Sequence, residues 1–153
     1  MTGMVELGVF LLIAVPICIV DLRELRIPDI LSLGGIALFI CLKLVFGQES
    51  FGRLAAEFFV GFGVFWLIRV VSRGKLGLGD AKLSALIAVA IGLSAWFASI
   101  FIASVIGLVF AAVAIGLFKM DRRTRLPFAP FLTAGAAIAG LAGSLHFLPD
   151  VWL

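Results

Sequence analysis

The run LSALIAVAIGLSAWFASIFIASVIGLVFAAVAIGLF, Leu83–Phe118, decides the fold, because it holds no charged residue and is too long for one membrane crossing. A straight helix over this run would be about 54 Å long, whereas the hydrocarbon core of a bilayer is about 30 Å thick. The run therefore predicts two helices that break near Gly92-Leu93-Ser94-Ala95. The first begins at Ala81 and is short, about 14 residues, which predicts that its starting end lies below the membrane surface. The second is Trp96–Phe118.

Four further apolar runs lie outside this stretch, and each is near the length of about 20 residues that a spanning helix needs. They are Val5–Val20, Ile30–Phe46, Leu54–Val71 and Pro127–Phe147. Six such helices leave no room for a separate soluble domain. The sequence therefore predicts an all-α, polytopic membrane helix bundle with six transmembrane helices, forming a single domain over residues 1–153.

The composition excludes the soluble classes of protein. Apolar residues make up 63% of the 153 residues and charged residues only 14%, against about 45–50% and about 25% in soluble domains. A water-soluble enzyme or a DNA-binding domain does not fit these values, so the lipid bilayer is the expected surrounding. The two cysteines form no CxxC pair, and we expect no metal and no cofactor.

The basic residues predict the orientation in the membrane. Ten of the 12 lysines and arginines lie in or beside three connections that six helices place on one side. These connections are Asp21–Asp29, Ser72–Lys82 and Lys119–Arg125, and only Lys43 and Arg53 fall elsewhere. Cytoplasmic loops carry such an excess of basic residues. We therefore expect a protein of the inner (cytoplasmic) membrane with both termini outside the cytoplasm, and no nucleic-acid partner.

Two aspartates stand at the ends of apolar runs on this cytoplasmic side. Asp21 directly follows the first run, and Asp80 directly precedes the short fourth helix. Carboxylates at membrane depth are expensive and usually functional. Two carboxylates brought together share a proton, so one can act as base on a water while the other polarises a carbonyl. This is the chemistry of an aspartic protease.

Each aspartate also has a simpler interpretation. Asp21 could be a helix-end acid paired with Arg23 or Arg26, and Asp80 could be the N-cap of the fourth helix. Glycines at positions 77 and 79 favour the functional interpretation of Asp80. They permit a close approach of the backbone, which a plain cap does not require.

Three blocks of sequence carry a resemblance to a known family. Gly77-Leu78-Gly79-Asp80 matches the GxGD signature of intramembrane aspartic proteases. Together with Asp21-Leu22-Arg23-Glu24-Leu25-Arg26-Ile27-Pro28-Asp29 it resembles the type IV prepilin peptidases. Leu126-Pro127-Phe128-Ala129-Pro130-Phe131-Leu132 is similar to that family's third block, usually PFGPFL, with Ala129 in place of glycine.

The resemblance implies an aspartic endopeptidase with Asp21 and Asp80 as the catalytic pair. Its expected substrate is a type IV pilin-like precursor, a single-pass membrane protein, whose short basic leader is removed at the cytoplasmic face. Asp29 is expected to cap the second helix, and Lys82 to reach lipid headgroups or to tune the charge of the pair. The residues expected to bind substrate or support the acids are Gly77, Gly79, Lys82, Arg23, Pro28, Asp29, Pro127 and Pro130.

The chain departs from many prepilin peptidases, which carry an N-terminal cytoplasmic domain with CxxC pairs and methylate the new N-terminus. It resembles the short, peptidase-only form of preflagellin and Flp (tight adherence) pilus systems, so we expect no N-methyltransferase domain. A presenilin-type protease should have a YD motif, and the sequence contains no tyrosine. Two alternative functions are a small polytopic channel or transporter and a non-catalytic membrane assembly protein.

Overall fold

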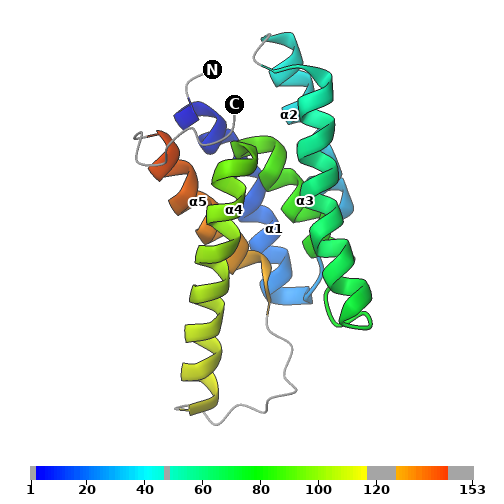
Figure 1. Cartoon of the computed structure of the whole chain (residues 1–153). Helices are drawn as coiled ribbons and strands as arrows, with labels where there is room; N and C mark the ends of the chain where they lie inside the picture. The colour runs from blue at the N-terminus through cyan, green and yellow to red at the C-terminus, as the bar shows by residue number, and fades with distance from the viewer. Residues whose placement is uncertain (1–2, 47–48, 117–126, 145–153) are drawn as a thin grey trace.

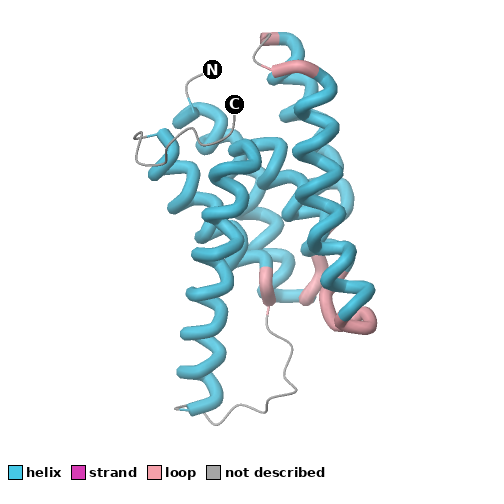
Figure 2. The backbone as a smooth tube through the Cα atoms, viewed as in Figure 1, coloured by secondary structure: helices cyan, strands magenta, loops and turns pink. Residues whose placement is uncertain are grey.

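The computed structural model describes residues 3–46, 49–116 and 127–144, and every regular element in these ranges is a helix. Figures 1 and 2 show the helices packed side by side as a bundle. They are α1 (Gly3–Glu24), α2 (Asp29–Val45), α3 (Phe51–Val71), α4 (Leu78–Gly116) and α5 (Ala129–Ser144). Among them α1, α3 and α4 are long and apolar enough to cross a membrane, by length and composition.

The element α4 consists of two helices that meet at Gly92. This glycine has φ 79° and ψ 162°, a backbone conformation outside the helical region, which glycine adopts without a steric penalty. The indole Nε1 of Trp96 donates to Oγ of Ser84 over 3.0 Å, although residues 12 apart in a straight helix are separated by about 18 Å. The second half therefore folds back along the first (Figure 1). The break expected near Gly92 is confirmed.

The first half of α4 forms the centre of the bundle. Residues 83–90 are completely buried, in agreement with a helix that is apolar on every side. The outer surface is apolar as well, since Leu12, Ile30 and Phe101 are 76%, 87% and 73% exposed. Such large exposed apolar side chains are typical of a protein surrounded by another apolar phase.

Helices α1 and α5 pack antiparallel, far apart in sequence. Sγ of Cys18 donates to Oγ1 of Thr133 over 3.1 Å near one end of the pair. At the other end, a Cβ on Gly3 would lie 3.2 Å from Oγ of Ser144. The start of α1 and the end of α5 therefore lie at the same end of the bundle, and Asp21 lies at the opposite end with the start of α5.

Several expected boundaries are wrong. Helix α1 continues through Asp21 to Glu24 instead of ending at Val20, and α3 begins at Phe51, with Ser50 as its N-cap, instead of at Leu54. Helix α4 begins at Leu78, so part of the glycine-rich stretch is helical. Helix α5 begins at Ala129 instead of Pro127. The basic loop Lys119–Arg125 and the last residues of the two final expected helices lie outside the described residues.

Candidate functional site

Asp21 lies in the last turn of α1 and is 5% exposed. Its Oδ2 accepts a hydrogen bond of 3.0 Å from the backbone N–H of Ala129, the first residue of α5. The first N–H groups of a helix have no partner within the helix and carry the positive end of its dipole, so a carboxylate is favourable there. Arg23 and Arg26 are exposed, and among the described residues neither forms an ion pair with Asp21. The interpretation of Asp21 as an arginine partner is therefore wrong.

Asp80 is the third residue of α4 and is half-buried. It is not the N-cap, because the helix begins two residues earlier. Its Oδ2 accepts a hydrogen bond of 3.1 Å from the backbone N–H of Gly77, which is the contact that an acid at the third helical position makes in a capping box. Asp80 lies at the same end of the bundle as Asp21, because Gly79 packs against Ile27, three residues after the end of α1.

Two contacts join the segment after α1 to the start of α4. A Cβ on Gly79 would lie only 2.7 Å from Cβ of Ile27, so the backbone at position 79 approaches Ile27 too closely for a side chain. Nζ of Lys82 lies 2.6 Å from Oδ1 of Asp29. Lys82 is therefore anchored to a carboxylate of the protein, and its expected contact with lipid headgroups stays a prediction.

Asp29 does not cap α2, contrary to the expectation. The N-cap is Pro28, with φ −66° and ψ 125°, and it makes no side-chain capping bond. The fixed φ of proline suits this extended position before the helix. Asp29 is instead the first residue of α2, and its carboxylate turns to Lys82. The carboxylate of Asp29 therefore pairs with a residue of α4 and does not cap its own helix.

The third sequence block forms the start of α5. The carbonyl of Phe128 accepts the N–H groups of Phe131 and Leu132 over 3.1 and 3.2 Å. Pro130 lies in the first turn, where its missing N–H costs no helical hydrogen bond, and Pro127 precedes the helix. Through Ala129, this block supplies the backbone donor of Asp21.

Two residues beside Asp21 were missed by sequence reasoning. Cys18 lies one turn before Asp21 on α1, and Thr133 lies one turn after Ala129 on α5, and the two are hydrogen-bonded. Each lies three or four positions from a site residue within an apolar run, and this spacing, which puts two residues on the same helix face, could have indicated them. Among the described residues, no group of three or more His, Cys, Asp or Glu side chains could hold a metal ion.

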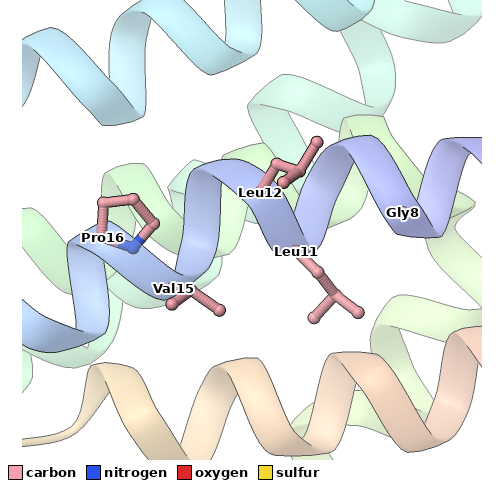
Figure 3. Close-up of a pocket in the computed structure, with 5 residues that line it drawn as sticks. All are labelled: Gly8, Leu11, Leu12, Val15 and Pro16. Carbon is pink, nitrogen blue, oxygen red and sulfur yellow. The ribbon is translucent and has the colours of Figure 1, made fainter.

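The structure also has an open cavity of about 460 Å³ on α1, shown in Figure 3. Its lining consists of Gly8, Leu11, Leu12, Val15 and Pro16. All five are apolar, and neither Asp21 nor Asp80 contributes to it. This cavity offers contact area to an apolar molecule but no group that could do chemistry.

Comparisons with known proteins agree with this arrangement. Residues 8–112 match the model of the type IV leader peptidase family. The chain is also similar to a prepilin leader peptidase/N-methyltransferase of Bacillus subtilis (strain 168), with 28% identity over 137 residues, 88% of this chain. It spans about half, 54%, of the length of that protein. No solved structure matches. Because the family match covers most of the chain, including both acids and the glycines before Asp80, the protein belongs to the type IV leader peptidase family.

Proposed function

We propose that the protein is a membrane aspartic endopeptidase that removes the short basic leader from a type IV pilin-like precursor, a single-pass membrane protein. The observation that carries the proposal is that Asp21, in the last turn of α1, and Asp80, in the first turn of α4, lie at one end of the bundle, where Gly79 packs against Ile27. One oxygen of each carboxylate is held by a backbone N–H. Within the described residues, Oδ1 of each carboxylate accepts no hydrogen bond.

In the proposed mechanism the two acids work as a unit, one carboxyl ionised and the other protonated, as in aspartic proteases. The ionised carboxylate takes a proton from water as the water oxygen attacks the scissile carbonyl carbon. The protonated carboxyl gives its proton to the carbonyl oxygen, which yields a neutral tetrahedral intermediate. Collapse of this intermediate moves one proton to the leaving nitrogen and leaves one proton on the pair, so the cycle closes.

The charges support an orientation with this end at the cytoplasmic face. Arg69 lies at the end of α3, Arg73 and Lys75 lie in the loop that leads to Asp80, and Arg23 and Arg26 follow Asp21. In the proposed topology, the fold-back at Gly92 divides α4 into two of six membrane-crossing segments, and both termini then lie on the opposite side. A cytoplasmic excess of basic residues supports insertion in the inner membrane, with the leader reaching the acids from the cytoplasm.

The two basic residues at the other end form ion pairs with acids. Nζ of Lys43 lies 3.2 Å from Oε1 of Glu49, and Nε of Arg53 lies 3.6 Å from Oε1 of Glu57. Lys43 and Glu57 are 3% and 1% exposed. The bias is counted on lysines and arginines, and ten of the 12 basic residues remain on the side of the acids.

The test is leader removal from a pilin precursor by membranes that contain Asp21→Asn, Asp80→Asn or the double variant at matched expression. Each single change should reduce cleavage by about 10²-fold or more, because an amide cannot exchange the proton. The double variant should be no worse than either single one, as expected for groups that act as a unit. Glu24→Gln, an exposed acid at the same end, is the matched control and should cleave normally. Cleavage by Asp80→Asn at the wild-type rate would refute the proposed mechanism.

A further inference from the structure

The ion pair between Lys82 and Asp29 differs from the other ion pairs of the described residues. Its N–O distance is 2.6 Å, whereas the others range from 3.2 to 3.8 Å. It joins residues 53 positions apart, the fifth residue of α4 and the first residue of α2. The side chain of Asp29 is 63% exposed and that of Lys82 is 23% exposed. Ion pairs this accessible to solvent contribute little to stability, so stability alone does not explain so close a contact.

Its place in the fold relates it directly to the acids. Lys82 lies two positions after Asp80 in α4. Asp29 ends the segment that begins at Asp21. Asp80 itself is bonded only within its own segment, to Gly77, among the described residues. Asp21 is bonded to α5. No direct bond therefore fixes one acid relative to the other, and their separation depends on contacts between the segments that carry them.

Two such contacts are made by residues that lie before and after Asp80 in the sequence. On one side Gly79 packs against Ile27, with no room for a side chain between them. On the other side Lys82 reaches Asp29. Pro28, with its fixed φ, lies between Ile27 and Asp29 and keeps the two attachment points at a set spacing. The start of α4 is thus held to the α1–α2 segment at two points, with Asp80 between them.

We propose that Lys82 and Asp29 form a positioning pair, which sets the separation of Asp80 from Asp21 without touching the substrate. The inference rests on the proposed function, because its catalytic consequence is a change in leader cleavage. A displacement of about 1 Å at a reacting group lowers the rate by about 10²-fold. Loss of one of the two attachment points should lower the rate of cleavage less, by about 10-fold, because the Gly79–Ile27 contact remains.

The kinetic test uses the purified full chain in lipid vesicles and a pilin precursor as substrate. Lys82→Gln and Asp29→Asn should each lower kcat about 10-fold, with KM and the thermal midpoint unchanged. The double variant should be no worse than either, and Lys82→Arg should keep most of kcat because it keeps the charge. The exchange variant Asp29→Lys/Lys82→Asp should recover part of the lost kcat. Lys75→Gln, an exposed lysine of the same end, is the matched control and should behave like wild type.

Other outcomes overturn the positioning role. A raised KM with unchanged kcat would mean that the two residues bind the leader, and multiplicative losses in the double variant would mean that they act independently. Wild-type kcat in both single variants would remove the inference while the proposed function stands. If the wild-type protein itself cleaved no leader, the proposed function would fail instead.

A second measurement tests the pair without activity. Spin labels at the exposed positions Leu33→Cys of α2 and Leu78→Cys of α4 report the separation of the two helix starts, in a background with Cys18 and Cys41 replaced by alanine. Lys82→Gln should broaden the distribution of distances between the labels, and Lys75→Gln should leave it narrow. An unchanged distribution in Lys82→Gln would refute the positioning role regardless of the substrate.

Discussion

Gly79→Ala tests how closely Asp80 must be placed, because position 79 lies directly before this acid. The added Cβ would lie 2.7 Å from Cβ of Ile27 and 3.2 and 3.3 Å from its Cγ1 and Cδ1. Apolar carbons prefer separations of about 3.5–4.0 Å. The start of α4 must therefore move away from Ile27 by about 1 Å. The branched Cβ belongs to the rigid part of the isoleucine side chain, so rotation of that side chain cannot relieve the contact.

The same substitution should affect stability much less than activity. Overpacking costs about 1–3 kcal/mol, but alanine is favoured over glycine in a helix by about 1 kcal/mol, and the two effects partly cancel. A displacement of about 1 Å at a reacting group lowers the rate about 10²-fold, which corresponds to about 2.7 kcal/mol of activation free energy. We therefore expect kcat/KM to fall about 10²-fold while most of the protein remains folded.

The assay follows initial rates of leader removal in lipid vesicles, beside thermal unfolding in detergent. Gly63→Ala in α3 is the matched control, because a Cβ there meets nothing within 4 Å, and it should keep full activity. Gly79→Ala/Ile27→Gly removes the contacting atom and should recover part of the rate. Wild-type rates in Gly79→Ala, or an equal loss in Gly63→Ala, would refute the link between this contact and the placement of Asp80.

Three further predictions concern packing and chemistry. Ser84→Ala should lower stability by about 1–3 kcal/mol, because Trp96 Nε1 loses its buried acceptor; thermal unfolding should show no such loss for the exposed Ser104→Ala. Gly135→Ala should destabilise by about 1–3 kcal/mol, since its Cβ would run into the backbone of Ser99 and Ala103, whereas Gly143→Ala, with open space around it, should unfold at the wild-type temperature. Leader cleavage should persist in excess EDTA, because a two-carboxylate mechanism needs no metal; loss of activity that a divalent cation restores would contradict the mechanism.

Helix existence and type could be read from the sequence because they follow from composition within each segment. Long runs without charge favour helices, in which every backbone polar group is bonded within the segment. The break at Gly92 followed from a length limit alone, since Leu83–Phe118 exceeds one bilayer crossing. The family resemblance is likewise a property of the sequence, and the family match over residues 8–112 confirms it. Two of the three blocks fall within these residues, and the third, Leu126–Leu132, lies beyond them.

Helix ends were less predictable, because apolar runs mark the part of a helix in an apolar surrounding and not the whole helix. The polar last turn of α1, Asp21–Glu24, continues the backbone hydrogen bonds past the apolar run. At α3 the side chain of Ser50 accepts from the N–H of Arg53 and starts the helix before the apolar run begins. Capping rules also proposed Asp29 as the cap of α2, but a cation from another helix competes more strongly for that carboxylate.

The partners of the candidate site were decided only by the tertiary structure. Asp21 meets the N–H of Ala129, 108 positions away, and Asp29 meets Lys82, 53 positions away. The central helix is apolar on every side, so no periodic pattern indicates which face meets which neighbour. Packing decides the orientation through close contacts such as Gly79 with Ile27, which depend on shape and leave no trace in local composition. The sequence by itself thus determined the helices, their charge asymmetry and the two acids, while the packing of those helices determined what each acid contacts.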